Sequence, residues 1–292
     1  MDNFFLDYKS FLSGIGASWS AIMVGQPLDI IKVRMQNTGN STISTVLALV
    51  RYEGILAFWK ASLPIVAGST ITSSVSLGTN ENTKRFFRDP KNPEKSLKIW
   101  QHSICGTASG FVRAFVICPF EHVVVKMQTQ GKIDTRGDPK YKNSADCFKY
   151  IFNNYGVKGL YRGLKVSFFR DTFGNTIFFG AYQGIAKKIF GGDHIDAHQL
   201  KMWQCMICGG TAGVIYWIGI FWLDIIKSKI QADSLTNPRY SSGKECWKMT
   251  VKEMGYAGMT RGLIPALLRA FPANAAYIAG FEMMMKILGR DK

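Results

Sequence analysis

Two segments of the chain place an acidic side chain three residues before a basic one. Asp29 precedes Lys32, and Asp224 precedes Lys227. Glu121 occupies the acidic place in a third segment of the same pattern. Ion pairs between such groups break and re-form reversibly, so they suit a gate between two conformations rather than a step that makes bonds.

The three segments are copies of one motif, spaced at roughly one third of the chain. They begin at Gln26, Cys118 and Phe221. Val124 replaces the base of the second copy, and Trp222 replaces the proline of the third. Each copy is followed by a glycine and then by a three-residue segment, which we call the second landmark. The landmarks are Trp59-Lys60-Ala61, Tyr161-Arg162-Gly163 and Thr260-Arg261-Gly262.

The elements that must position these residues are also repeated. Each third of the chain is predicted to form a long helix, a short amphipathic helix and a second long helix. Small residues four positions apart precede each motif and allow close helix packing in membranes. These small-residue pairs are Gly14 and Ser18, Gly106 and Gly110, and Gly209 and Gly213. We therefore expect three repeats at residues 1–94, 95–194 and 195–292, forming one domain.

Composition favours a membrane protein. Hydrophobic residues make up 47% and charged residues only 19% of the 292 positions, which excludes compositional disorder. Six spans of about 20 residues fit this length. The net charge of +16 is scattered around apolar stretches, without a nucleic-acid motif or a long basic run. Nucleic acid is therefore not an expected partner, whereas membrane lipid is.

The three motifs resemble the mitochondrial carrier family, over the whole chain. The resemblance implies an all-α membrane protein with six transmembrane helices in three pseudosymmetric repeats, with short amphipathic helices on the matrix side. It also implies a multi-pass position in the inner mitochondrial membrane and transport by alternating access rather than enzymatic activity.

The resemblance further implies a ring of ion pairs on the matrix side, between the acid of one repeat and the base of the next. Lys32 would pair with Asp224, and Lys227 with Glu121. Asp29 would lack its partner because of Val124. Three glutamines would brace the pairs, namely Gln36, Gln128 and Gln231.

A second gate on the cytoplasmic side is implied on the second long helix of each repeat. Its residues would be Glu81, Lys84, Gln183 and Glu282. Only the first repeat has both an acid and a base there. Such a gate would be weak, which shifts the conformational balance without preventing transport.

The resemblance places the substrate contacts midway along the same helices. They are predicted to be Gly68, Ser69, Arg170, Asp171 and Arg269, with Arg113 as an added positive charge. Charged side chains inside a membrane are costly, so a functional role is the default interpretation. Arginine would bind a carboxylate and Asp171 an amine. The alternative for Arg170 and Asp171 is an internal ion pair that fixes packing.

The segment from Arg269 to Ala276 resembles the carnitine/acylcarnitine and the ornithine (basic amino acid) carriers. A small carboxylate-bearing amine is therefore the predicted substrate. Thr72 stands where ornithine carriers have an acid, which makes a dibasic amino acid a poorer match. Nucleotides fit less well, because Gly68 and Ser69 offer neither a basic nor an aromatic contact.

No catalytic motif and no metal-ligand spacing appears in the sequence, so neither a catalytic site nor a metal is expected. No cofactor is expected either, apart from a structural lipid such as cardiolipin. One alternative remains open: a carrier-fold protein that has lost transport and serves as a structural subunit of a larger inner-membrane complex, for example a respiratory one. Departures at the gates, such as Val124 and Trp222, favour that alternative, whereas Arg170, Asp171 and Arg269 favour transport.

Overall fold

A computed structural model describes residues 2–87, 99–130, 138–190 and 202–288 of the chain. In that part the chain forms helices and no strand. Repeat 1 contains α1, α2, η1 and α3, repeat 2 contains α4 to α6, and repeat 3 contains α7, α8, η3 and α9. Their bounds are α1 Asp2–Thr38, α2 Thr42–Glu53, η1 Ile55–Trp59, α3 Ser62–Phe87, α4 Ile99–Thr129, α5 Ser144–Leu160, α6 Leu164–Phe190, α7 Met202–Ala232, α8 Gly243–Met254, η3 Tyr256–Thr260 and α9 Leu263–Ile287.

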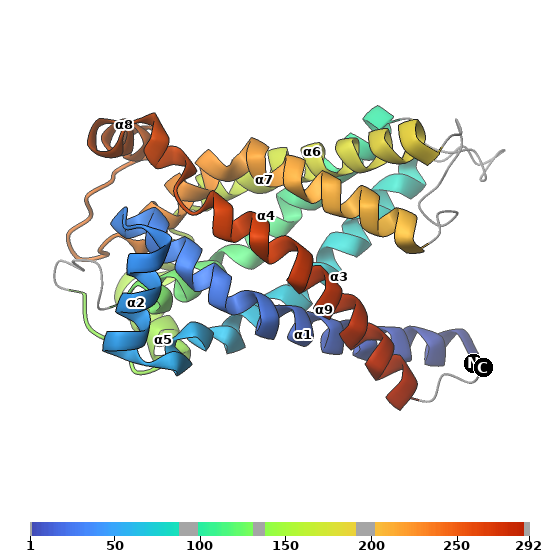
Figure 1. The fold of residues 1–292 in the computed structure, drawn as a ribbon, viewed down its shortest axis with the longest axis horizontal. Helices are drawn as coiled ribbons and strands as arrows, with labels where there is room; N and C mark the ends of the chain where they lie inside the picture. The colour runs from blue at the N-terminus through green and yellow to red at the C-terminus, as the bar shows by residue number, and fades with distance from the viewer. Residues whose placement is uncertain (1, 88–98, 131–137, 191–201, 289–292) are drawn as a thin grey trace.

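The six long helices form a closed bundle. α3 packs along α4, α4 along α6, and α6 along α7, while α9 returns to pack along α1. The short helices α2, α5 and α8 gather at one end of the bundle, on the left of Figure 1. We call this the short-helix end. The predicted order of long, short and long helix is present in each repeat.

Capping residues and glycines set the ends of the short helices. Ser41, Asn143 and Ser242 each accept a hydrogen bond from a backbone N–H in the first turn of α2, α5 and α8. The glycine that follows each motif has a positive φ, at 79° for Gly54 and 62° for Gly156. Glycine reaches this conformation without steric cost, which accounts for its recurrence in the sequence.

The last residue of the second landmark also has a positive φ in each repeat, but in repeat 1 this residue is not a glycine. Gly163 and Gly262 lie at φ 84° and 90°. Ala61 occupies the same place in repeat 1 at φ 67°. A side chain with a Cβ is strained in this region, so repeat 1 carries a local cost that the other repeats avoid.

The small-residue pairs have different surroundings. A Cβ at Gly110 of α4 would lie 2.6 Å from the carbonyl oxygen of Asp171 in α6, so the two backbones touch there. A Cβ at Gly14, Gly209 or Gly213 would meet nothing within 4 Å. Close packing is therefore seen at Gly110, whereas at these three positions no atom of the described residues comes within 4 Å of an added Cβ.

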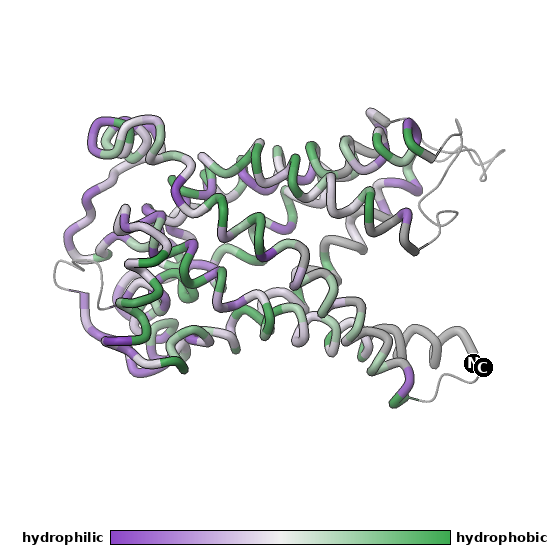
Figure 2. The backbone as a smooth tube through the Cα atoms, in the orientation of Figure 1, coloured by the Kyte–Doolittle hydropathy of each residue, from purple (hydrophilic) through white to green (hydrophobic). Residues whose placement is uncertain are grey.

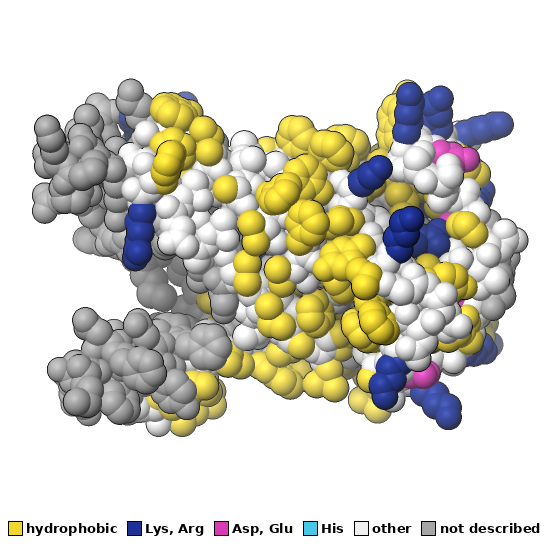
Figure 3. All heavy atoms as spheres, turned by 180° about the vertical axis from the view of Figure 1, so that it is seen from behind, with side chains coloured by type: hydrophobic (Ala, Val, Ile, Leu, Met, Phe, Trp, Pro, Cys, Tyr) yellow, Lys and Arg dark blue, Asp and Glu magenta, His cyan; other side chains and the backbone are white. Residues whose placement is uncertain are grey.

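The surface fits a membrane span. In Figure 2, hydrophobic residues predominate along the middle of the long helices, and hydrophilic residues are frequent at the short-helix end. Figure 3 shows a band of hydrophobic side chains across the face, with many Lys and Arg side chains at that end. Three segments of the described chain are long and apolar enough to cross a membrane. These segments are Ile55–Thr72, Ile104–Thr129 and Ile207–Ala232.

Candidate functional site

The acids and bases of the three motifs meet inside the bundle, near the short-helix end. We call Asp29, Lys32, Glu121, Asp224 and Lys227 the ion-pair ring. Lys32 Nζ of α1 lies 2.7 Å from Asp224 Oδ2 of α7. Gln36 donates a hydrogen bond of 2.8 Å to the same oxygen. The Lys32 ammonium also stands 4.0 Å from the centre of the Trp217 ring, so a cation–π contact adds to the pair.

The second pair of the ring joins repeats 2 and 3. Lys227 Nζ of α7 lies 2.7 Å from Glu121 Oε2 of α4. The side chains of Lys227, Lys32 and Asp224 are each at most 8% exposed. Both pairs are those that the order of the repeats predicts. Charges this deeply buried are stable only while they remain paired, so the ring can hold the bundle closed at this end.

Arg170 of α6 is bound to the ring rather than standing apart as a free substrate contact. Its guanidinium reaches Glu121 Oε1 at 2.9 Å, Asp224 Oδ1 at 3.2 Å and Asp171 Oδ1 at 2.6 Å. The side chains of Arg170 and Asp171 are 8% and 1% exposed. The two residues therefore form the internal ion pair that the sequence left as an alternative, and they extend it into the ring.

Asp29 has a partner, which corrects the expectation that it would lack one. Arg269 Nε of α9 lies 3.0 Å from Asp29 Oδ1. The aliphatic part of the arginine crosses α1 beside Gly25, where an added Cβ would stand 3.4 Å from Arg269 Cγ. The long side chain of Arg269 thus supplies the cation that Val124 does not.

The remaining predicted substrate contacts are uncharged or lie outside these pairs. Gly68 faces α4, because a Cβ there would lie 2.9 Å from Phe120 Cβ. Ser69 donates a hydrogen bond to the carbonyl of Val66 in its own helix. Arg113 is half-buried and joins no ion pair among the described residues. Gly68 therefore packs closely against α4, and its role as a substrate contact stays a prediction.

The bracing glutamines and the cytoplasmic gate are only partly visible. Gln36 braces Asp224, as expected. Both side-chain polar atoms of Gln231, and Oε1 of Gln128, are buried without a hydrogen-bond partner in the described part of the chain, so the expected bracing is not seen there. On the opposite end, Lys84 and Gln183 are half-buried. The side chains of Glu81 and Glu282 lie outside the described residues.

A second buried cluster, which the sequence analysis missed, joins repeats 2 and 3 next to the ring. Asp138, in the loop before α5, lies 2.6 Å from Lys126 Nζ. It also accepts hydrogen bonds from the backbone N–H groups of Leu235 and Thr236. Burial alone would raise the pKa of Asp138, but Lys126 and these N–H groups lower it to about 2.

Further contacts of this cluster come from Asp233, at the end of α7. Lys126 donates a second hydrogen bond of 2.7 Å to the Asp233 carbonyl. Arg162 pairs with the Asp233 carboxylate at 2.7 Å and donates to the carbonyl of Ser234. Asp138 begins the segment Asp138-Pro139-Lys140-Tyr141, which matches Asn237-Pro238-Arg239-Tyr240 of repeat 3, but the acid itself is not repeated, so the three motifs did not point to it. The signal in the sequence was the basic residues Lys126 and Arg162 of repeat 2, because buried cations require acidic partners.

Comparison with known proteins agrees with this architecture. The family model described as mitochondrial carrier protein matches residues 7–91, 95–193 and 198–292. The glutamate/glycine mitochondrial carrier ymc1 of Schizosaccharomyces pombe is 32% identical over 282 residues, covering 94% of this chain and 92% of its own. The mitochondrial glycine transporter YMC1 of Saccharomyces cerevisiae is 32% identical, covering 96% and 92%.

A third relative has a different substrate in its name. The mitochondrial basic amino acids transporter of Homo sapiens is 29% identical over 282 residues, covering 94% of this chain and 89% of its own. The match extends over all three repeats, and the predicted resemblance is thereby confirmed. The helical bundle, the ring of ion pairs and the threefold match together place the chain in the mitochondrial carrier family, as a multi-pass transporter of the inner membrane and not an enzyme.

Proposed function

We propose that this carrier moves a small α-amino acid with a neutral side chain across the inner mitochondrial membrane by alternating access. The observation that carries the proposal is the pair formed by Arg269 and Asp29. It puts one cation and one anion side by side, which matches the two charges of an amino-acid zwitterion. The glycine carriers among the relatives support the same substrate class.

The accessibility of this pair supports its role in binding. The side chains of Arg269 and Asp29 are 31% and 29% exposed. An ion pair exposed to lipid would be costly, so we expect this exposed surface to face the interior of the bundle, where a substrate would enter. Arg170, at 8% exposure, already contacts three carboxylates and is less available to a substrate.

The groups around the pair of Arg269 and Asp29 limit the charge that the substrate can carry. A dibasic amino acid needs a further anion, whereas the buried carboxylates Glu121, Asp171 and Asp224 are already bound to cations. Thr72, which is buried, donates to the carbonyl of Gly68 in its own helix. A neutral amino acid therefore suits the site better than ornithine.

Uptake into proteoliposomes tests the proposal. Liposomes loaded with unlabelled glycine, ornithine, glutamate or carnitine are assayed for exchange with the same labelled compound. We expect saturable glycine exchange by the native protein and a loss of roughly tenfold to a hundredfold in Arg269→Ala, because a charged hydrogen-bond partner is removed. Arg51→Ala, an exposed change on α2, is the matched control.

Two results would count against this function. Saturable exchange of ornithine or carnitine without glycine would replace the substrate class. No saturable exchange of any of the four compounds, by protein shown to be folded, would favour the alternative of a structural subunit of a membrane complex.

We further propose that an anionic lipid such as cardiolipin binds the outer groove between α6, α7 and α8. The groove has a volume of about 350 Å³ and is lined by apolar side chains, with Lys165 and Lys244 among the lining residues. Two lysines beside an apolar surface suit a phosphate with acyl chains. Cardiolipin should raise the unfolding temperature of the native protein more than that of Lys244→Ala, and an equal rise would exclude this groove.

A further inference from the structure

The place of Asp29 differs from that of the other two acids of the ion-pair ring. Glu121 is bound by Lys227 and Arg170, and Asp224 by Lys32 and Arg170. Asp29 has one cation, Arg269, among the described residues. In the ring order that the family resemblance implies, its base would come from the second copy of the motif, where Val124 stands instead. Asp29 is therefore the ring acid that a single exchange of partners can release.

We infer that Asp29 is a substrate-binding residue, which pairs with Arg269 in the empty carrier and binds the ammonium group of the amino acid in the loaded one. This inference rests on the proposed function, since it assigns the second half of the zwitterion site. It also makes Val124 a specificity-determining position, because the absence of a base there leaves Asp29 available.

The geometry of the pair fits a contact that is made and broken in each cycle. Arg269 approaches side-on, with Nε at 3.0 Å and Nη1 at 3.3 and 3.4 Å from the carboxylate oxygens of Asp29. Arg34 and Glu53 form a closer bidentate pair, at 2.7 and 2.8 Å. Longer hydrogen bonds and partial exposure to water make the Asp29 pair the weaker of the two.

The exchange replaces one ion pair by two and leaves no charge without a partner. In the empty carrier, Arg269 and Asp29 neutralise each other. When the substrate enters, its carboxylate takes the guanidinium of Arg269 and its ammonium takes the carboxylate of Asp29. No charge is left unpaired at either stage, so the desolvation cost of an isolated charge is avoided. A carboxylate without an amine would leave Asp29 unpaired, so the site selects the zwitterion.

The exchange also links binding to the ring. Asp29 belongs to the ring by its place in the motif, and Arg269 reaches it from another repeat, so a substrate between the two replaces a direct contact between α1 and α9. The difference in free energy between the empty and the substrate-loaded ring shifts the equilibrium between the two conformations of the carrier.

Binding measurements on three variants test the inference. Dissociation constants for glycine and for acetate, which lacks the amine, are obtained from the ligand-dependent rise of the unfolding temperature in detergent. In Asp29→Asn the preference for glycine over acetate should fall at least tenfold. Val124→Lys should do the same, because the new ammonium competes for Asp29. Arg51→Ala, an exposed change on α2, is the control and should keep the native preference.

The outcomes separate the inference from the proposed function. Native protein that neither binds nor exchanges glycine overturns both. Native protein that exchanges glycine, with an unchanged preference in Asp29→Asn, overturns the inference alone. If Val124→Lys does not fold, the near-isosteric Asp29→Asn decides the question by itself.

Discussion

The junction between repeats 2 and 3 differs from the junction between repeats 1 and 2 at the same end of the bundle. Repeats 2 and 3 share the ring pair of Glu121 and Lys227, and beside it the buried cluster around Asp138. Repeats 1 and 2 meet at Val124 in place of a ring pair. There Arg34 Nε donates to the carbonyl of Gln128, and Val33 packs with Val125.

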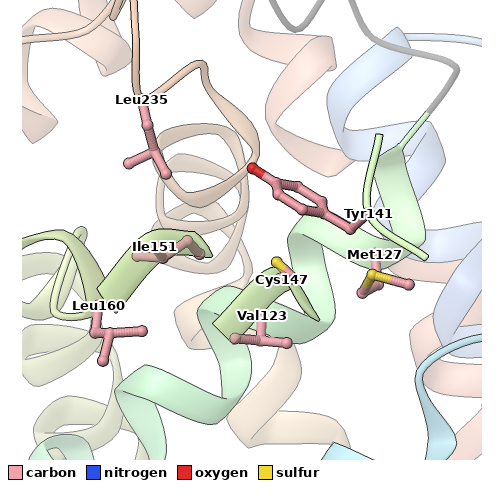
Figure 4. Packing of buried hydrophobic residues seen from close by; sticks show 7 residues of the cluster. All are labelled: Val123, Met127, Tyr141, Cys147, Ile151, Leu160 and Leu235. Atoms are coloured by element: carbon pink, nitrogen blue, oxygen red, sulfur yellow. The ribbon is translucent and has the colours of Figure 1, made fainter. Parts of the chain in front are cut away.

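The hydrophobic packing shows the same difference. Leu235 of repeat 3 lies in a cluster with Val123, Met127, Cys147 and Ile151, among other residues of repeat 2 (Figure 4). A buried side chain from another repeat ties the two together more strongly than a surface contact, because separation exposes it to water. The contrast indicates that repeats 2 and 3 are joined more strongly at this end than repeats 1 and 2.

The largest effect should follow from breaking the Asp138 cluster. Asp138→Asn leaves Lys126 buried without its anion, which costs about 3 kcal/mol. We expect the unfolding temperature to fall by roughly 5 to 10 °C. A thiol-reactive dye can report the unfolding transition, because burial raises the pKa of Cys147 to about 12 and keeps its thiol unreactive in the folded protein. Asp146→Asn, an exposed change, is the control, and an equal fall there would remove the contrast.

Removing the apolar contact between repeats 2 and 3 should have the next largest effect. Leu235→Ala takes a side chain of 9% exposure out of the cluster, at a cost of about 2 to 3 kcal/mol. The unfolding temperature measures it, with Leu47→Ala on α2 as the control, since Leu47 is 63% exposed. If both changes lower the temperature equally, Leu235 does not join the two repeats.

The stability that Asp138 provides should depend on pH in a stated direction. Its pKa is lowered in the folded protein from 3.8 to about 2. A lowered pKa of an acid gives stability that is fully present above the unfolded value and is lost as the pH falls towards the folded value. The difference in unfolding temperature between native protein and Asp138→Asn should therefore shrink between pH 4 and pH 2. A constant difference over that window would contradict this assignment.

The smallest predicted effect lies within repeat 1 and has the opposite sign. Ala61→Gly relieves the positive φ of 67° and should stabilise the protein by about 1 kcal/mol. Gly163→Ala makes the reverse change in repeat 2 and should destabilise it. Thermal unfolding of the two variants checks both signs. Changes of the same sign would show that the landmark positions are not equivalent in the repeats.

The sequence was sufficient where the repeat pattern determined the answer. The order of long, short and long helices follows from three copies in one register, and the pairs of Lys32 with Asp224 and Lys227 with Glu121 are those that the family resemblance implied. Repetition fixes which positions face the interior, so it predicts contacts between equivalent positions well.

The pattern failed where a contact joins positions that are not equivalent. Arg170 and Arg269 have long side chains that reach into the ring from the first third of α6 and α9, and no repeat rule gives their direction. Asp138 lies in a loop whose match in repeat 3 has Asn237 in its place, so no repeated acid marked it as buried. The repeat pattern therefore does not predict how far a long side chain reaches or which loop residue becomes buried.

The position of Leu235 also has a consequence for how the protein is made. The hydrophobic cluster of α4 and α5 is completed by a residue that lies beyond α7 in the chain. Until that part of the polypeptide has been synthesised, imported and threaded through the membrane, the second repeat has an open gap in its apolar interior. Its assembly must therefore wait for the third, and a chain truncated after α7 would present the exposed cluster to chaperones and proteases.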